Sequence, residues 1–286
     1  MIKKEHKDLV TIKRACQLLE VSRSGYYDWL KRPKKAKADI FGQKVKRVFE
    51  KSHRVYGARR IKKELGSEGL VVSRKRVRHK MAELGLVAKA RRKTQATTDS
   101  NHTKPVAPNL LGRQFDTKEP NKVWVMDITY LATRQGWLYL AVVIDLYSRM
   151  VVGWCVDNRM KKELVMSALD MAVRRRNPSP GLICHSDRGS QYCSNAYQEL
   201  LNRHGFICSM SRKGECQDNA CAESFFHSLK VEWIYGEPVR SRHATRQRIR
   251  EYIEVFYNRQ RLHSSNGYLS PEGFERANEF RLPVSA

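Results

Sequence analysis

The sequence lacks the features that place proteins in a membrane or outside the cell. No apolar run approaches the roughly 18 residues needed to cross a bilayer, and the first ten residues are polar, without the apolar core of a signal peptide. Its seven cysteines form no Cys-x-x-Cys pair, and an odd number in a chain of this length makes a poor disulfide framework. These absences predict a cytoplasmic protein with reduced thiols and no zinc site.

Acidic residues are scarce relative to basic ones. The chain has 55 Lys and Arg against 29 Asp and Glu, a net charge of +26. Because each cation that neutralises a phosphate releases a condensed counterion, this excess favours a nucleic-acid partner and predicts association with the nucleoid. Residues 1–110 carry 30 basic and 10 acidic residues, whereas residues 111–286 carry 25 and 19. A basic N-terminal part therefore precedes a more balanced part that can hold functional carboxylates.

Helical patterns in the basic part indicate two small helical units. Apolar residues at helical spacing over 9–19, followed by a break and a second short pattern over 24–30, predict a helix-turn-helix segment within residues 1–34. The charged, proline-containing stretch that follows predicts a linker. Residues 38–88 contain three further helical patterns and are interpreted as a second helix-turn-helix domain, which binds DNA.

The last helix of this second domain is its most basic one. Ser73 can cap the N-terminus, and the helical pattern runs through Val77 and Met81 to Leu84. Such a helix suits a major groove, although a solvated cationic helix face has the same pattern. The charge excess of the N-terminal part favours DNA. The candidate DNA-binding residues on this helix are Arg74, Lys75, Arg76 and Arg78.

The more balanced part predicts an α/β domain over residues 120–280, after a basic linker over 89–119. Runs of β-branched and aromatic residues indicate three strands joined by short turns, which form a meander in the simplest topology. Helices and short strands then alternate, as is typical of α/β folds. The predicted strands cover residues 123–131, 137–146, 150–156, 182–185 and 206–210, and the predicted helices cover 164–173, 194–204, 219–231 and 246–256.

Three carboxylates of this domain are candidates for metal chemistry. Asp127 interrupts an apolar strand pattern, where an ionised group is costly unless a metal ion or a partner compensates it. Asp187 follows a short buried strand, where α/β proteins place their sites, although a turn-forming Asp is the alternative. Glu223 lies one turn into a predicted helix. Together, without a His or Cys cluster, they suit the hard ions Mg²⁺ or Mn²⁺.

The spacing and context of these carboxylates resemble a known family. Between Asp127 and Asp187 lie 59 residues, and between Asp187 and Glu223 lie 35, an interval similar to that of DDE transposases and retroviral integrases. Four ordered motifs resemble the OrfB-type transposases of the bacterial insertion-sequence-three family. They are Val-Trp-Val-Met-Asp-Ile-Thr-Tyr at 123–130, His-Ser-Asp-Arg-Gly-Ser-Gln-Tyr at 185–192, the stretch 210–226 with Ser-Arg-Lys-Gly at 211–214, and Tyr-Asn-Arg-Gln-Arg at 257–261 with Gly-Tyr at 267–268.

The resemblance implies a fold, a reaction and a set of partners. The fold is an RNase H-like core, a five-stranded mixed sheet flanked by helices, in which Asp127, Asp187 and Glu223 bind two Mg²⁺ or Mn²⁺ ions. The implied reaction cleaves the ends of a mobile element and joins them to target DNA by hydrolysis and transesterification, without a covalent enzyme intermediate. The implied partners are terminal-repeat and target DNA, an OrfA subunit or an OrfA–OrfB fusion, and further copies of the chain on DNA. No membrane is implied.

Further DNA-binding candidates come from helix geometry. Asn219, His227 and Lys230 stand four residues before, four after and seven after Glu223, so they share its helix face. Arg259 and Arg261 end a basic and aromatic helical stretch in which one face can pack while the other binds phosphate. We interpret all five as candidate DNA contacts.

Other readings of the sequence stay open at this point. The chain could be an RNase H-like nuclease without strand transfer, or an inert helix-turn-helix regulator. Tyr257 is a weak alternative nucleophile, which would imply a different recombination chemistry. Among the remaining polar and aromatic residues, His185 and Asp145 are expected to be structural, Asp218 to cap a helix, and Trp124, Trp137 and Trp154 to lie in the core.

Overall fold

The computed structural model describes residues 11–31, 39–89, 106–213 and 215–278, and the chain divides into two units, Met1–Lys44 and Val45–Ala286. In the first unit, helices α1 (Ile12–Leu18) and α2 (Arg23–Lys31) confirm the two predicted N-terminal helices, and of their residues only Cys16 is buried. Across the described ranges, no helix combines the length and the apolar character needed to span a bilayer. The domain boundaries drawn from the sequence differ from this division and remain predictions.

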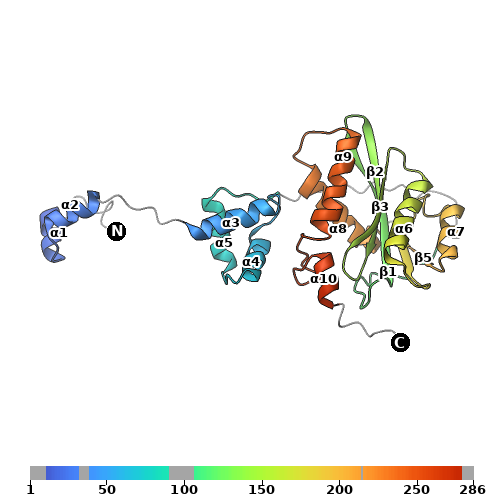
Figure 1. Cartoon of the computed structure of the whole chain (residues 1–286), viewed down its shortest axis with the longest axis horizontal. Helices are drawn as coiled ribbons and strands as arrows, with labels where there is room; N and C mark the ends of the chain where they lie inside the picture. The colour runs from blue at the N-terminus through green and yellow to red at the C-terminus, as the bar shows by residue number, and fades with distance from the viewer. Residues whose placement is uncertain (1–10, 32–38, 90–105, 214, 279–286) are drawn as a thin grey trace. The chain divides into compact units, whose positions relative to one another are not determined.

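Three helices form the second helical group: α3 (Ile40–Lys51), α4 (Ala58–Ser67) and α5 (Arg74–Glu83) (Figure 1). Their apolar side chains recur at helical spacing and are buried, namely Val45, Val48, Phe49, Ile61, Leu65, Val77 and Met81. The Ser73 hydroxyl accepts a hydrogen bond from the Arg76 amide at 3.2 Å, which confirms the predicted N-cap. The basic side chains of α5 that were predicted to bind DNA are exposed.

A five-stranded sheet forms the centre of the second unit. Its strands are β1 (Val123–Thr133), β2 (Gly136–Asp145), β3 (Val151–Asp157), β4 (Ile183–Ser186) and β5 (Ile207–Met210), in the order β3-β2-β1-β4-β5. The first three strands pair antiparallel as the predicted meander, and β4 and β5 run parallel to β1. The mixed five-stranded sheet predicted from the sequence is therefore confirmed.

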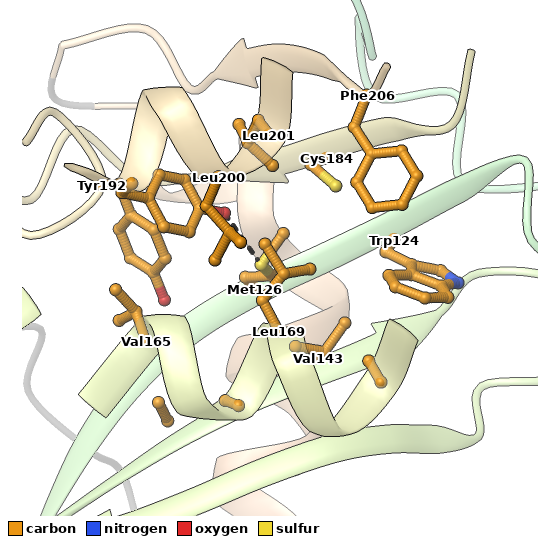
Figure 2. Packing of buried hydrophobic residues seen from close by; sticks show 14 of the residues in the cluster. Trp124, Met126, Val143, Val165, Leu169, Cys184, Tyr192, Leu200, Leu201 and Phe206 are labelled. Carbon is orange, nitrogen blue, oxygen red and sulfur yellow. Dashed lines mark hydrogen bonds between the residues drawn. The ribbon is translucent and has the colours of Figure 1, made fainter. Parts of the chain in front are cut away.

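Helices cover both faces of this sheet (Figure 1). Helices α6 (Lys162–Arg176) and α7 (Asn195–Arg203) lie on one face, and α8 (Ala220–Leu229) and α9 (Arg242–Arg250) lie on the other. Figure 2 shows the core beneath α6 and α7, in which Trp124, Met126 and Tyr192 pack with aliphatic side chains. A Cβ atom at Gly153 of β3 would collide with the Ala168 carbonyl of α6, so glycine allows this helix to approach the sheet.

The C-terminal region contains two π-helical segments that the sequence did not predict. Residues Lys230–Ile234 and Glu251–Tyr257 are π-helical, continuing α8 and α9, and α10 (Pro271–Asn278) follows. A π-helical turn accommodates one more residue than an α-helical turn, so a hydrophobic pattern with a period of 3.6 residues does not reveal it. Both π-helices bring buried polar side chains into the interior.

One of these π-helices connects α4 and the residues after α5 to the C-terminal helices within the second unit. Glu232 is buried and accepts hydrogen bonds from Arg261 at 2.7 Å on each carboxylate oxygen and from the Tyr252 hydroxyl at 2.8 Å. Arg60 of α4 lies 3.5 Å from the same carboxylate, and Lys89 donates to the Glu232 carbonyl at 2.8 Å. This buried network connects α4 and the residues after α5 to the C-terminal helices.

Tyr56 makes a second connection between the same two regions. Its hydroxyl donates to the Gln260 carbonyl at 3.0 Å and accepts from the Leu262 amide at 2.9 Å. Burial raises the pKa of Tyr56 to about 12, so the hydroxyl keeps its proton and can do both. The three-helix group is therefore docked on the segment that follows α9.

Part of the predicted linker is packed. The Met210 amide of β5 donates to the Pro108 carbonyl at 3.2 Å, and the Leu110 amide donates to the Ser209 hydroxyl at 2.9 Å. Leu111 is buried. Residues 90–105 of the predicted linker lie outside the described residues, but the stretch around 108–111 is part of the fold.

Candidate active site

Strand pairing brings the two aspartates together. Val123, Trp124 and Val125 of β1 pair with Ile183, Cys184 and His185 of β4, an offset of 60 residues. The same offset separates Asp127 from Asp187, so the two aspartates occupy equivalent positions two residues beyond the paired segment. Because β4 ends at Ser186 while β1 continues, Asp187 stands at the end of its strand beside Asp127.

The pKa of Asp127 shows that the other two carboxylates lie near it. Burial raises the pKa of Asp127 well above its ordinary value, and the nearby charges of Asp187 and Glu223 raise it further. The charge of Lys230 and a hydrogen bond from the Ile128 amide, 2.8 Å from Oδ1, act in the opposite direction. The three predicted carboxylates and Lys230 therefore belong to one electrostatic site.

Local backbone geometry positions the other two carboxylates. Asp187 Oδ1 accepts a hydrogen bond from the Gly189 amide at 2.9 Å, and a Cβ atom at Gly189 would stand 3.0 Å from that oxygen, so glycine permits the tight turn. Glu223 lies exposed in the first turn of α8. Asn219, just before α8, donates to the Met126 carbonyl at 3.0 Å and so fixes the start of this helix beside β1.

The donor set suits a divalent cation, although the carboxylates do not form a closed cage. The charges of Asp187 and Glu223 raise the proton affinity of Asp127, and a hard cation bound there would replace the proton and relieve that repulsion. Across the described ranges, no three His, Cys, Asp or Glu side chains stand close enough together to enclose an ion. Glu223, from a helix rather than from the sheet, is the exposed member of the three.

The remaining residues predicted to line this face fall in different environments. The Lys230 ammonium lies 5.3 Å from the Tyr130 ring centroid and acts on the pKa of Asp127, so it belongs to the site. His227 is half-buried, and its Nε2 has no hydrogen-bond partner among the described residues. Asn219 is buried, and its contact with Met126 gives it a structural role.

The two C-terminal arginines predicted to bind DNA, Arg259 and Arg261, lie in different environments. Arg259 is exposed and lies 3.5 Å from Glu272. Arg261 is buried against Glu232, away from the exposed face on which the sequence analysis expected it to contact phosphate. The physical reason is its partner, because a guanidinium with two hydrogen bonds to a buried carboxylate is held inside the protein.

The alternative nucleophile Tyr257 is not accessible. It is buried, its ring packs edge-on against Phe225 at 4.8 Å, and burial raises the pKa of its hydroxyl far above the ordinary value. A tyrosine nucleophile needs contact with DNA and an activated hydroxyl, and Tyr257 has neither. The structure therefore argues against the tyrosine chemistry that the sequence left open.

Two structural roles expected from the sequence are confirmed. His185 is buried between the hydroxyls of Ser209 at 2.9 Å and Ser211 at 3.2 Å, and burial lowers its pKa to about 4, so it is a neutral core residue. Asp145 is buried and accepts hydrogen bonds from Arg176 at 3.2 Å and from the amides of Asn121 and Tyr147. Both side chains have protein partners, and neither needs a ligand.

The core prediction is wrong for one of the three tryptophans. Trp124 is fully buried, and Trp154 is partly buried with its indole donating to Glu254 at 2.7 Å. Trp137 is 51% exposed at the start of β2, and its ring meets Tyr130 edge-on at 4.9 Å. The sequence did contain a signal of this exposure, because Trp137 directly follows the Gln135-Gly136 turn and the end of a strand next to a turn often lies outside the core.

Asp218 is an ion-pair acceptor rather than the expected helix cap. It lies in the 3-10 turn Cys216–Asn219 before α8, fully buried, and accepts from Asn109 at 2.8 Å, from Arg113 at 2.7 Å, and from Arg212. The hydrogen bonds from Arg212 hold the pKa of this carboxyl well below its usual range, although burial acts against them. Asp218 therefore ties the segment around 109–113 to the loop that leads into α8.

Replacing Asp218 by Asn should destabilise the protein in a pH-dependent manner. Since the folded pKa lies below the unfolded value of about 3.9, the stabilisation is complete above that value and is lost as the pH falls through the folded pKa. We expect Asp218→Asn to lower the melting temperature by several degrees at pH 7 and the difference from wild type to narrow progressively as the pH falls below about 4. Asp116→Asn, at an exposed carboxylate, is the control. A difference that stays constant with pH would contradict this role.

Comparisons with known proteins give family matches along most of the chain. Residues 36–94 match an HTH-like domain family, and residues 117–216 and 223–278 match integrase core domain families. The chain is 47% identical over 279 residues to the transposase InsF for insertion sequence IS3A of Escherichia coli strain K12, covering 96% of this chain and 97% of the relative. It is 46% identical over 262 residues to a 31 kDa protein of insertion element IS600 of Shigella sonnei, covering 91% and 96%.

Solved structures of retroviral proteins are also similar to this chain. One belongs to a simian T-cell lymphotropic virus intasome, with 14% identity and a TM-score of 0.48 over 85% of this chain and 76% of the other. Another is the HTLV-2 integrase catalytic core domain in complex with magnesium, with 16% identity and a TM-score of 0.41 over 54% and 96%. The family is shown by the 47% identity to an insertion-sequence transposase, which extends over 96% of the chain. The chain therefore belongs to the IS3 family of insertion-sequence transposases, which are metal-dependent polynucleotidyl transferases with an integrase core.

Proposed function

We propose that this transposase cleaves the ends of its insertion element and joins them to target DNA by phosphodiester hydrolysis and transesterification with two Mg²⁺ or Mn²⁺ ions. The observation that carries the proposal is the strand register that sets Asp127 beside Asp187, with Glu223 and Lys230 acting on the same carboxylate. A bound cation stabilises carboxylates whose charges repel one another, so the effect of Asp187 and Glu223 on Asp127 supports a metal site.

Each carboxylate has its own part in the proposed site. Asp127 and Asp187 supply oxygen donors from adjacent strands, and Glu223 closes the site from α8. When bound, the metal ions would hold the attacking and departing oxygens of one phosphodiester in line and neutralise the charge that develops between them. Lys230 adds a fixed cation beside Asp127, where it can hold a phosphate of the bound strand.

The exposed basic face of α5 is the proposed reader of the element ends. Arg74, Lys75, Arg76 and Arg78 are exposed on this helix, while its Val77 and Met81 are buried. This division suits a helix that packs on one side and enters a major groove on the other. Arg259 and His227 stay in the proposal as DNA contacts near the C-terminal helices and α8. An OrfA subunit, or a fusion to one, and further copies of the chain complete the proposed assembly.

Neutralising two cations of α5 should flatten the salt dependence of DNA binding. Arg74 and Arg78 are four residues apart and share a helix face, so Arg74→Gln with Arg78→Gln removes two phosphate contacts. The slope of log affinity against log salt should fall by about 1.8 for two lost contacts. It can be measured by fluorescence anisotropy with terminal-repeat duplex. Arg174→Gln with Arg203→Gln, exposed on α6 and α7, is the matched control and should leave the slope unchanged. Equal slopes for both pairs would exclude α5 from the interface.

A strand-transfer assay tests the proposed function directly. Purified full chain, with and without the OrfA subunit of the same element, is incubated with labelled terminal-repeat DNA, target plasmid and Mg²⁺ or Mn²⁺. Joined product supports the proposal. Nicked donor without joining would assign a nuclease, and binding without cleavage would assign a DNA-binding regulator.

A further inference from the structure

Beyond Asp127, the β1–β2 hairpin and the segment after α8 present aromatic and basic side chains of which the proposed chemistry uses only Lys230. We call this set the hairpin surface: Tyr130, Arg134, Trp137, Lys230, Arg240 and Arg242. It begins at the active site, because the Lys230 ammonium acts on Asp127 and lies 5.3 Å from the Tyr130 ring. The Tyr130 ring meets the exposed Trp137 indole at 4.9 Å. Lys230, Tyr130 and Trp137 thus form a row of contacts that starts at a lysine whose charge acts on Asp127 and ends at an exposed aromatic ring.

Three arginines are gathered at the far end of the hairpin surface. The segment after the first π-helix is tied to the hairpin turn, since the Arg134 amide donates to the Arg240 carbonyl at 2.9 Å and the Arg134 guanidinium donates to Val239 at 2.8 Å. The Arg242 amide donates to the Gln135 side chain at 2.7 Å. These hydrogen bonds hold residues 239–242 against the turn between β1 and β2, so Arg134, Arg240 and Arg242 lie near the same turn.

Most of this positive charge is not neutralised within the described part of the chain. Arg240 forms an ion pair with Glu237 at 3.3 Å, whereas Arg134 and Arg242 have no ion pair with any described residue. The Nε atoms of Arg240 and Arg242 have no hydrogen-bond partner in the part of the chain that the structure describes. Guanidinium groups donate hydrogen bonds in a geometry that matches phosphate oxygens.

The combination of residues points to one kind of ligand. A single exposed tryptophan needs no explanation, but an exposed indole beside another ring, with a lysine at one end and three arginines at the other, is the composition of surfaces that bind single-stranded nucleic acid. Bases stack on the rings, and the backbone phosphates follow the cations. A protein partner would not require four cations around one aromatic pair.

The dimensions fit DNA that leaves the active site along the hairpin. At about 3.3 Å per residue, Tyr130 lies about 10 Å along β1 from Asp127, and Arg134 about 23 Å. With about 3.4 Å per nucleotide along one strand of B-DNA, these distances correspond to about three and about seven nucleotides. The aromatic pair therefore meets the first few nucleotides next to the scissile phosphate.

We propose that the hairpin surface holds the DNA strand that flanks the scissile phosphate, with Trp137 stacked on an unpaired base and the arginines on the backbone. This inference rests on the proposed function, because it takes Asp127 as part of the reacting centre. Separating base pairs at the cleavage point costs a few kcal/mol, and stacking on an aromatic ring returns about 1–3 kcal/mol per base. Trp137 is thus a positioning residue that stabilises an opened DNA end.

Crosslinking tests the contact independently of turnover. Terminal-repeat duplexes carrying 5-iododeoxyuridine at one position each, from one to seven nucleotides from the cleavage point, are bound to the full chain and irradiated. We expect a crosslink to the peptide containing Trp137 from positions within about five nucleotides, which is the reach set by the strand geometry. Crosslinks elsewhere in the protein, with none to this peptide, would overturn the proposal.

Kinetics of matched variants test the role of the stacked ring. Trp137→Ala should slow cleavage of fully paired donor DNA about tenfold or more, a loss in line with one stacked base. Trp137→Phe should keep most activity, and mismatches at the flanking positions of the donor should restore the rate of Trp137→Ala. Ile207→Ala, at an exposed apolar residue on β5, is the control and should cleave at the wild-type rate.

Failure of this inference is distinguishable from failure of the proposed function. If wild-type protein joins DNA and Trp137→Ala joins fully paired donor at the same rate, the hairpin surface does not hold an opened strand. If Trp137→Ala changes only the sedimentation coefficient of the protein, the surface is a protein interface and the inference is wrong. If wild-type protein crosslinks through Trp137 but never joins DNA, the DNA contact stands and the proposed strand transfer falls.

Discussion

An Asp187→Asn variant is expected to lose strand cleavage and joining while it still folds and binds terminal-repeat DNA. The asparagine Oδ1 can accept the same hydrogen bond from the Gly189 amide, so the turn after β4 keeps its shape. What disappears is one negative charge next to Asp127. Removing several kcal/mol of transition-state stabilisation lowers the rate by about a thousandfold or more.

The same variant should be as stable as the wild type, or more stable. In the folded, metal-free protein the charge of Asp187 raises the pKa of Asp127, which means that the two carboxylates repel each other. Removing that charge relieves the repulsion, so the melting temperature without metal should stay equal or rise. Loss of activity together with a maintained melting temperature separates a functional carboxylate from a structural one.

Asp127→Asn and Glu223→Gln are expected to give the same loss of activity. Glu199→Gln, at an exposed glutamate in α7, is the matched control and should join DNA at the wild-type rate. Rates are measured with labelled donor DNA in Mg²⁺ and in Mn²⁺, and DNA binding is measured in parallel. Joining retained in any one of the three variants would remove that residue from the proposed site.

Replacing Arg261 by Met should be the most destabilising single change in the second unit among those considered. It leaves the Glu232 carboxylate buried without its two hydrogen bonds from the guanidinium. Removing one partner of a buried ion pair costs about 3–5 kcal/mol. For a unit of this size, that loss lowers the melting temperature by roughly 10 °C.

A double-variant cycle identifies the ion pair as the source of this loss. Burial raises the pKa of Glu232, but the charge and hydrogen bonds of Arg261 outweigh it and lower the pKa overall, so the pair is ionised at neutral pH. Glu232→Met combined with Arg261→Met should be less destabilised than the sum of the two single variants. Glu272→Gln, which breaks exposed contacts to Arg259 and Arg276, is the control and should cost less than about 1 kcal/mol. Additive losses would show that the two residues act separately.

The central sheet was predictable because its strands carry their own signals. Long apolar and β-branched runs predicted β1, β2 and β3, and the alternation of helices and short strands that follows predicted β4 and β5. The placement of Asp127 beside Asp187 was implied by the family resemblance, and the pairing of β1 with β4 explains it physically. Local composition cannot supply this pairing, because parallel strands are joined through distant segments.

The features that escaped prediction depend on partners far away in the chain. Arg261 resembled a phosphate contact because its partner Glu232 lies 29 residues earlier, in a π-helical turn that periodicity does not show. Trp137 resembled a core residue because hydrophobicity alone does not tell which end of a strand leaves the interior. Asp218 resembled a helix cap because Arg113 approaches it from a segment more than a hundred residues away.

The pairing of β1 with β4 also determines how the sequence can vary over evolution. The two aspartates are aligned by strand register, so the length of chain between them is not what holds them together. The connection at 177–182, between α6 and β4, can lengthen at small cost, because doubling a loop costs only about 0.6 kcal/mol. A one-residue slip of β4 against β1 would instead turn Asp187 to the opposite face of the sheet. Insertions should therefore accumulate in the connecting loops of related transposases, while the four residues of β4 keep their alignment with β1.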